Sequence, residues 1–381
     1  MNIVTIIGAR PQIIKASAIS RAIRNGFSKQ LKEIIIHTGQ HYDANMSEIF
    51  FEELEIPHPN YNLDVRSGSH GAQTAKMIEG IENILLKENP DALLVYGDTN
   101  STLAGAIAAS KIHVPVIHIE AGLRSYNKSM PEEINRIMCD HVSTLLFSPT
   151  RQGYNNLLKE GFNMMAQHPY SADNPKIYHC GDIMLDNSLH FAGIAESKSN
   201  ILNKHDLTKG NFILGTIHRD NNTDIPERLT EIFNALLQIA EKGETIILPL
   251  HPRTSSKIKS LLKKEMQKNI ANNANIKIVE PASFLDMIML EKNCKMIITD
   301  SGGVQKEAYF FKKPSLILRS ETEWTEILEN NAAVLTDADS EKIISGYLSM
   351  TEADIQFPEI FGDGKAAEFI CSEINLLCNR I

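Results

Sequence analysis

Several features that mark particular protein classes are missing from this chain of 381 residues. The net charge is −9, and the lack of a basic excess argues against a surface that binds nucleic acid. The five cysteines are scattered and include no C-x-x-C pair, which is typical of reduced thiols in the cytosol. No apolar run reaches the roughly 18 residues that a membrane-spanning helix needs. We therefore expect a cytoplasmic protein with no nucleic-acid partner and no membrane insertion.

Motifs for cofactors, metals and hydrolase triads are also missing. The first apolar run leads into "GARPQIIK" (8–15) rather than G-x-G-x-x-G, so the dinucleotide fingerprint is absent. No H-x-x-x-H or clustered Cys/His spacing indicates a transition-metal site, and no G-x-S-x-G elbow indicates a hydrolase. That first run has no basic region before it, which favours a strand over a signal peptide. We expect neither a cofactor nor a protein-bound metal.

Short runs rich in Val, Ile and Leu alternate with helical patterns along the chain. Such continuous apolar strands are typical of parallel sheets covered on both faces, and the alternation indicates a doubly wound α/β fold. The length, with 43% hydrophobic residues, suits two domains. Strands are expected at 2–8, 32–39, 91–98, 114–122 and 144–150, and again at 212–218, 245–251, 276–281, 296–301, 314–319 and 332–337.

The alternation weakens at 164–178, where Pro, Asn and Asp gather, and restarts after 198–211. This second, polar stretch is the best linker candidate. We predict an N-terminal Rossmann-like domain over residues 1–175 and a second one over 176–360. An amphipathic helix at 361–381 is expected to pack back on the body.

Polar residues follow most of the predicted strands. Ligands of open α/β sheets bind beyond the carboxyl ends of the strands, so these residues are the site candidates. They are Arg10, Lys15, Gln40, His41, Asp98, Glu120, His218, His251, Arg253, Ser301 to Gly303, and Arg319 to Glu326. Each has a structural alternative: Asp98 also suits a helix N-cap, and Pro252 alone explains a turn at His251.

The segment "IEAGLRSYNKSMPEEINR" (119–136) gathers several charges after an apolar run. Pro131 fits the first turn of a helix, where the dipole stabilises Glu132 and Glu133. Glu120 has no such explanation. A carboxylate at the end of a buried strand has a raised pKa unless it is paired, which suits acid–base chemistry.

The segment "TDSGGVQKEA" (299–308) is a strand end, two glycines and a helix start. Ser301 can cap the helix, and Gly302 and Gly303 let backbone N–H groups approach an anion such as a diphosphate. Glu307 is placed to take sugar hydroxyls. An ordinary βα turn is the alternative. Arg10 and Lys15 suit phosphate neutralisation or, alternatively, surface charge.

Taken in order, nine motifs resemble the UDP-N-acetylglucosamine 2-epimerase family over residues 2–360. They are "GARPQIIK", "HTGQHYD", "GDTNST", "IHIEAGLRS", "PEEINR", "HR" at 218–219, "LPLHPR", "TDSGGVQKEA" and "RSETEW". The resemblance implies two Rossmann-like domains in the glycosyltransferase-B arrangement with an interdomain cleft, a UDP-sugar substrate and a homodimer. It implies inversion at C2 by anti-elimination of UDP, a 2-acetamidoglucal intermediate and re-addition, a step of polysaccharide biosynthesis.

The resemblance also implies roles for individual residues. Asp98, Glu120 and Glu132 match the acid–base carboxylates, which leaves Glu133 as a dipole-stabilised or salt-bridged acid. His218 matches the group beside the leaving diphosphate. The substrate-binding positions are Arg10, Lys15, Arg219, His251, Arg253, Ser301, Gly302, Gly303 and Glu307. Met287 stands where the family has an aromatic residue against uracil.

Departures from the family pattern affect substrate choice and regulation. Tyr42, "SGSHGAQT" (67–74) and Asp220 replace residues of a second, activating UDP-sugar site. "RSETEW" and "GDIMLD" (181–186) resemble the branch that acts on UDP-2,3-diacetamido-2,3-dideoxyglucuronate, whose uronate needs a cation such as His70 or Arg219. That sugar, UDP-N-acetylglucosamine and a UDP-releasing reaction all stay open. A glycosyltransferase or a non-catalytic binder would have no common task for the three carboxylates.

Overall fold

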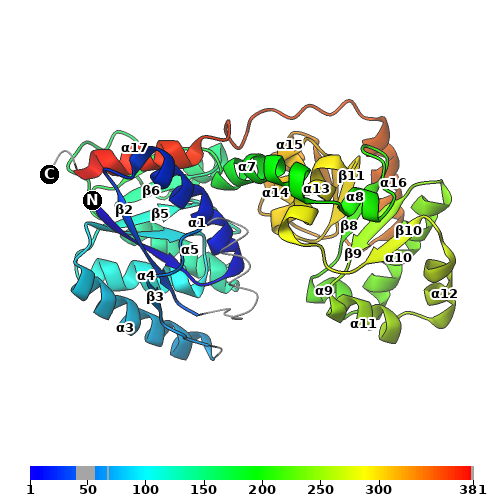
Figure 1. Ribbon diagram of the computed structural model, residues 1–381, viewed down its shortest axis with the longest axis horizontal. Coiled ribbons are helices and arrows are strands. Elements are labelled where there is room, and N and C mark those ends of the chain that lie inside the picture. Colours follow the sequence, from blue (N-terminus) through cyan, green and yellow to red (C-terminus); the bar gives the residue numbers. More distant parts are fainter. Residues whose placement is uncertain (40–55, 67, 379–381) are drawn as a thin grey trace. The chain divides into compact units, whose positions relative to one another are not determined.

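The computed structural model describes residues 1–39, 56–66 and 68–378. The chain folds as two α/β units (Figure 1). The first comprises Met1–Asn187 and Glu359–Ile381, and the second comprises Ser188–Pro358. Within the described part of the chain, no helix combines the length and the apolar character that crossing a bilayer requires.

The first unit is built on a parallel sheet with the strand order β3-β2-β1-β4-β5-β6-β7. The strands are β1 (Asn2–Ile7), β2 (Lys32–His37), β3 (Tyr61–Asn62), β4 (Ala92–Tyr96), β5 (Val116–Ile119), β6 (Leu145–Ser148) and β7 (Lys176–His179). The chain order reverses between β1 and β4. In open α/β sheets this switch point is where ligands bind, so the loops after β1 and β4 are the first place to look for a site.

Helices cover both faces of this sheet. They are α1 (Arg10–Ala22), the π-helical η1 (Ile23–Phe27), α3 (His70–Glu88), α4 (Asn100–Lys111), α5 (Pro131–Val142), α6 (Arg151–Lys159), the first part of α7 (Ile183–Lys198) and α17 (Ala366–Cys378). On one face, Met77 of α3 and Ala104 of α4 pack with Ile6 and Val95 of the sheet. On the other, α1 and α17 lie side by side (Figure 1).

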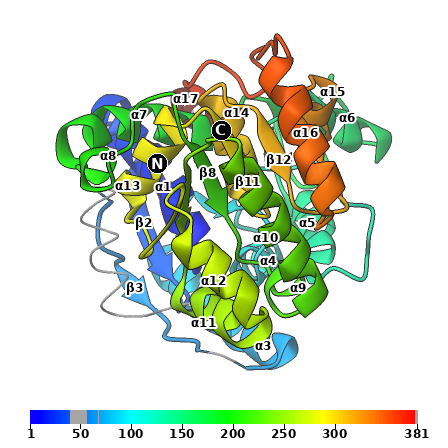
Figure 2. The same ribbon diagram turned by 90° about the vertical axis from the view of Figure 1, so that its right-hand side faces the viewer.

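The second unit repeats this architecture with the strand order β10-β9-β8-β11-β12-β13. Its strands are β8 (Ile213–Thr216), β9 (Ile246–Pro249), β10 (Ile276–Val279), β11 (Met296–Thr299), β12 (Ser315–Ile317) and β13 (Ala333–Leu335). Its helices are α8 (Ile201–Lys204), α9 (Asp220–Thr223), α10 (Pro226–Glu241), α11 (Pro252–Leu261), α12 (Lys264–Asn272), α13 (Phe284–Asn293), α14 (Gly302–Phe310), α15 (Thr325–Glu329) and α16 (Ser340–Glu352). The switch point lies between β8 and β11. Figure 2 shows α10 and α16 side by side over the sheet, where Phe233 and Ile343 pack with Ile298 and Leu316.

The predicted doubly wound α/β fold is confirmed, and every strand predicted above is present, although several are shorter. The boundary predicted at 175/176 is wrong, because β7 pairs with β6 and so belongs to the first sheet. The linker predicted at 198–211 is also wrong, because it contains α8 and lies inside the second unit. The predicted C-terminal helix is α17. It packs on α1, and the carboxylate of Asp186 accepts the backbone N–H groups of Ala366 and Ala367 at its start.

Candidate active site

An ion pair between Lys15 and Glu120 lies at the switch point of the first sheet. Lys15 comes from α1 and Glu120 follows β5, and their side chains are only 14% and 11% exposed. Gly97, which follows β4, lies directly beneath the pair. A Cβ atom at Gly97 would stand 3.1 Å from Glu120 Oε2 and 3.2 Å from Lys15 Nζ. A side chain at this position would crowd the ion pair, so glycine provides the space that the two charged groups need.

The backbone of Glu120 is in a conformation that non-glycine residues rarely adopt. Its φ is +74°, and its N–H and that of Ala121 both donate to the Phe147 carbonyl at 3.0 Å. Such a conformation costs about 1–3 kcal/mol and clusters at functional sites. The bend at the end of β5 directs the carboxylate toward Lys15. The sequence singled out Glu120 as a carboxylate at the end of a buried strand, and the structure shows that its backbone has a positive φ.

Asp98 lies in the same cluster and interacts with both other predicted carboxylates. Its side chain is 35% exposed, and its Oδ2 lies 3.5 Å from Arg136 Nη1. Burial raises the pKa of Asp98, and the charges of Glu120 and Glu132 add to the rise against the opposing effect of Arg136 and Lys15. A carboxyl group with a raised pKa keeps its proton closer to neutral pH, which suits a general acid.

Glu132 and Glu133 are neighbours on α5 with different surroundings. Glu132 is exposed. Glu133 is 1% exposed, accepts the N–H groups of Ser125 and Tyr126 at 2.9 Å, and lies 3.5 Å from Arg136 Nε. Glu133 thus fixes the loop before α5, while Glu132 keeps a carboxylate beside the Asp98 cluster.

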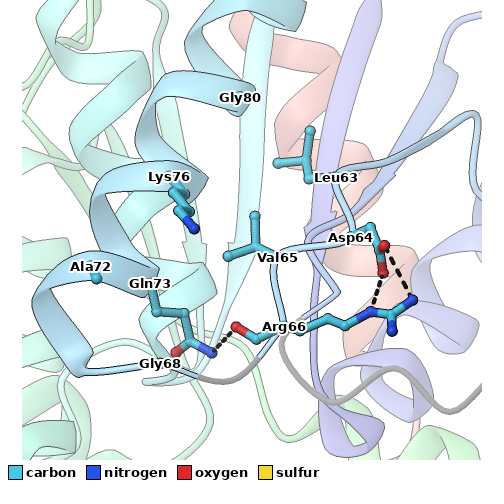
Figure 3. A pocket seen from close by; sticks show the side chains of 9 residues that line it. All are labelled: Leu63, Asp64, Val65, Arg66, Gly68, Ala72, Gln73, Lys76 and Gly80. Atoms are coloured by element: carbon cyan, nitrogen blue, oxygen red, sulfur yellow. Dashed lines mark hydrogen bonds and ion pairs between the residues drawn. The ribbon is translucent and has the colours of Figure 1, made fainter.

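The first unit contains a pocket of about 400 Å³. Residues of the segment after β3 and of α3 line it (Figure 3). Gln73 lines it and accepts a hydrogen bond from Asn100 Nδ2 at 3.0 Å. His70 Nδ1 lies 3.1 Å from the same nitrogen. Asn135 then donates to the Asp98 carbonyl at 2.8 Å and to Asn100 Oδ1 at 3.4 Å. Amide side chains therefore connect the pocket and His70 to the loop of Asp98.

In the second unit, a buried carboxylate organises the turn that carries His218. Asp300 follows β11 and accepts the N–H groups of His218 and Arg219 at 3.0 and 3.1 Å, and Asn222 Nδ2 at 3.1 Å. Partial burial and the charge of His251 lower the pKa of His218 against the effect of Asp300. His218 is therefore neutral near pH 7, since even an unperturbed histidine is mostly neutral there.

The first turn of α14 has the geometry of an anion-binding site. Ser301 caps the helix, with Oγ accepting Val304 N–H at 3.4 Å, and α14 begins at Gly302. The first N–H groups of a helix have no partner within it and attract anions. Two charged side chains lie near Gly302: where its Cβ would stand, Glu323 Oε1 is 2.5 Å away and Arg319 Nη1 is 3.8 Å away. Arg319 Nη1 also lies 2.9 Å from Glu323 Oε2. Glu307 follows on the same helix.

The remaining candidates of the second unit have structural partners. His251 caps α11, its Nδ1 accepting Arg253 N–H at 3.3 Å. The Arg253 guanidinium forms ion pairs with Asp220 and, at 2.7 Å, with Asp224. Met287 is half-buried on α13. In the first unit, Arg10 is exposed at the start of α1. Gln40, His41 and Tyr42 lie outside the described residues.

Comparison with known proteins identifies the family. The model of the UDP-N-acetylglucosamine 2-epimerase family matches residues 25–375. The chain belongs to this family. It is 49% identical over 372 residues to UDP-2,3-diacetamido-2,3-dideoxy-D-glucuronate 2-epimerase of Pseudomonas aeruginosa, with 97% of this chain and 98% of that protein covered. It is 43% identical over 374 residues to UDP-N-acetylglucosamine 2-epimerase of Methanocaldococcus jannaschii, with 97% and 98% covered.

Solved structures of the epimerase family agree in fold. The Methanocaldococcus jannaschii UDP-GlcNAc 2-epimerase, in complex with UDP-GlcNAc and UDP, matches with a TM-score of 0.83 and 42% identity, covering 99% of this chain and all of that one. The Neisseria meningitidis UDP-GlcNAc 2-epimerase bound to UDP-GlcNAc matches with a TM-score of 0.82 and 27% identity, covering 98% and 99%. The resemblance inferred from the nine motifs is thereby confirmed.

Two residues of this epimerase-family site were not among the sequence candidates. Arg136 is 7% exposed and faces Asp98, and its place four residues after Glu132 on one helix is the signal that could have found it. Asp300 lies at the end of the strand predicted at 296–301, as Asp98 does in the strand predicted at 91–98, and that position is the signal that could have found it. Among the described residues, no group of three or more His, Cys, Asp or Glu side chains is arranged to hold a metal ion.

Proposed function

We propose that this chain inverts C2 of a UDP-sugar by eliminating UDP and adding it back. The observation that carries the proposal is a cluster at the switch point of the first sheet, in which Asp98 interacts with Glu120, Glu132, Lys15 and Arg136, and Lys15 pairs with Glu120. The reaction needs a base for the C2 proton and an acid for the opposite face of the sugar. Two carboxyl groups in different electrostatic surroundings suit these two tasks.

The first half of the reaction requires a base that removes the C2 proton. A carboxylate removes the C2 proton, the C2–H electrons form the C1=C2 bond of a glycal, and UDP leaves with the C1–O electrons. Glu120 suits the base, because Lys15 pairs with its carboxylate and removes any need for a proton there. Its strained backbone holds the carboxylate in place before the substrate binds.

The second half of the reaction requires an acid that protonates C2. A carboxylic acid gives its proton to C2 on the other face, and the UDP oxygen re-forms the bond to C1. Asp98 suits the acid, since burial and two neighbouring carboxylates raise its pKa. Glu132 completes the set as the exposed carboxylate that exchanges protons with solvent between turnovers.

The second unit supplies the groups that bind the departing diphosphate. The first turn of α14, capped by Ser301, offers backbone donors, and Arg319 adds a positive charge. A neutral His218 donates a hydrogen bond to the diphosphate. Glu307 takes ribose hydroxyls and Met287 packs against uracil, in line with the roles that the family resemblance implies. The proposal includes a cytoplasmic homodimer that needs no cofactor and acts in polysaccharide biosynthesis.

A second candidate substrate is UDP-2,3-diacetamido-2,3-dideoxyglucuronate. The 49% identity to the Pseudomonas aeruginosa enzyme of that name favours it, as do the "RSETEW" and "GDIMLD" segments. Its C6 carboxylate requires a cation, for which His70, in the network around Asn100, and Arg219 are the candidates.

An NMR time course with the two UDP-sugars side by side tests both candidates. The true substrate is expected to reach an equilibrium of two C2 epimers while the UDP stays esterified. Accumulation of free UDP and free sugar would replace the proposal by a hydrolysing reaction. No change in either sugar would overturn it.

A further inference from the structure

His118 is a fully buried histidine with acceptors at both ring nitrogens. It is the third residue of β5 and is 0% exposed. Its Nδ1 lies 2.7 Å from Asp140 Oδ1, and its Nε2 lies 2.8 Å from the Gly97 carbonyl oxygen. A carbonyl oxygen only accepts hydrogen bonds, so Nε2 carries a proton. An ionised Asp140 likewise requires a proton on Nδ1, and the ring is then an imidazolium.

The contacts of Asp140 with groups other than His118 favour its ionised form. Its Oδ2 accepts Gly122 N–H at 3.1 Å and lies 2.7 Å from Arg124 Nη2. Burial alone would raise the pKa of Asp140, but hydrogen bonds and charges from His118 and Arg124 outweigh burial and lower it. Oδ2 therefore faces two donors besides His118, which favours a carboxylate at Asp140.

The charges around this pair also balance. Arg124 forms a two-pronged contact with Glu160, at 2.7 Å through Nε and 2.6 Å through Nη2. Two cations, His118 and Arg124, are thus matched by two anions, Asp140 and Glu160. A neutral His118 beside an ionised Asp140 would leave a surplus negative charge among side chains that are mostly buried, which is unfavourable.

The His118–Asp140 pair holds together the three segments that carry the proposed acid–base carboxylates. Gly97, whose carbonyl accepts from His118, immediately precedes Asp98. Gly122, whose N–H donates to Asp140, follows Glu120 by two positions. Asp140 itself lies on α5, about two turns after Glu132. Glu120 has a positive φ of +74°, and a residue other than glycine keeps such a conformation only where the surrounding structure imposes it.

We propose that His118 and Asp140 form a buried imidazolium–carboxylate pair that positions Asp98, Glu120 and Glu132 for reaction at C2. They are positioning residues, because their contacts are with the backbone beside the carboxylates. This inference rests on the proposed function for its kinetic consequence, whereas the charge state of His118 does not depend on it.

The Asp140→Asn substitution tests the pair in the full-length protein. An amide NH2 group turned toward Gly122 N–H makes a donor–donor contact, and one turned toward His118 requires Nδ1 to lose its proton, so the charged pair is lost in either orientation. The expected result is a fall in kcat of about 100-fold, with KM and the Kd of UDP little changed, since small displacements of catalytic groups cost about that much. Glu33→Gln is the matched control. It changes a partly buried carboxylate of the same sheet, which accepts from Thr5 and Ser20 at 2.7 and 2.6 Å, and is expected to keep the wild-type kcat.

Ring 15N NMR of histidine-labelled protein tests the charge state independently of activity. The His118 signals of the wild type are expected to show N–H at both nitrogens. In Asp140→Asn the second N–H is expected to be lost. A neutral His118 in the wild type would overturn the inference even if the enzyme epimerises its substrate, and so would a wild-type kcat in Asp140→Asn. A wild type without epimerase activity would overturn the proposed function alone.

Discussion

Replacing Glu120 by Gln is expected to lower kcat more than it lowers the free energy of unfolding. The amide keeps the shape of the side chain but loses the negative charge that pairs with Lys15, and both side chains are more than four-fifths buried. The amide oxygen still accepts a hydrogen bond from Lys15. We therefore expect a loss of unfolding free energy of about 1.5–3 kcal/mol, the usual worth of a hydrogen bond to a charged group, and less than the 3–5 kcal/mol for deleting a buried partner.

The effect on turnover is expected to be larger. An amide does not accept the C2 proton, and removing a general base lowers kcat by about 10²–10⁴-fold. That range is about 2.7–5.4 kcal/mol of transition-state stabilisation. The groups proposed to bind UDP belong to the second unit, so the Kd of UDP is expected to stay near the wild-type value. Urea unfolding, UDP titration calorimetry and the NMR time course measure the three quantities on one preparation.

Glu133→Gln is the comparison that makes this result interpretable. Glu133 accepts the N–H groups of Ser125 and Tyr126 through different oxygens, so an amide turns one of these bonds into a donor–donor contact. We expect Glu133→Gln to lower the free energy of unfolding more than Glu120→Gln does, and to lower kcat less. If Glu120→Gln instead weakens UDP binding and turnover equally, Glu120 is structural and the reasoning is refuted.

Three further predictions follow from the same geometry. Ser301→Ala removes the cap of α14 and is expected to cost about 1 kcal/mol of stability and to weaken UDP binding; unchanged UDP affinity in calorimetry would contradict the diphosphate assignment. Gly97→Ala forces alanine into a φ of +61°, at a cost of about 1–2 kcal/mol, and crowds the Lys15–Glu120 pair; a wild-type kcat would contradict the packing described. Because the folded-state pKa of Asp98 is raised above its ordinary value of 3.8, its contribution to stability is present below that value and is lost as pH rises through the folded pKa. Asp98→Asn is therefore expected to gain stability relative to the wild type as pH rises from 3.8 through the folded-state pKa of Asp98. A difference in urea midpoint between the two proteins that does not change with pH would refute the raised pKa.

The sequence was sufficient to predict the strands and most of the site because both follow from local patterns. Apolar runs mark buried parallel strands, and polar residues after them mark the ligand-binding edge. β7 was missed because Tyr178 is only partly buried and His179 is exposed at the edge of the sheet, so the segment lacks an apolar run. Missing β7 also moved the predicted domain boundary.

Contacts between distant segments could not be predicted in this way. His118 lies within the apolar run "VIHI" and reads as a core residue, while Asp140 is separated from it by a loop and most of a helix. Lys15 and Glu120 are 105 residues apart, and nothing local indicates that they pair. Arg253 looked free to bind substrate, but Asp220, noted only as a departure from the family pattern, holds it in an ion pair.

Deuterium incorporation at C2 tests the central claim most directly. The account predicts that the wild-type enzyme, incubated in deuterium oxide with its UDP-sugar, places one solvent deuterium at C2 of the epimerised product, because the proton leaves to one carboxylate and returns from another. Epimerised product that retains its original C2 hydrogen, or no exchange with any UDP-N-acetylhexosamine or its diacetamido-uronate analogue, would contradict it.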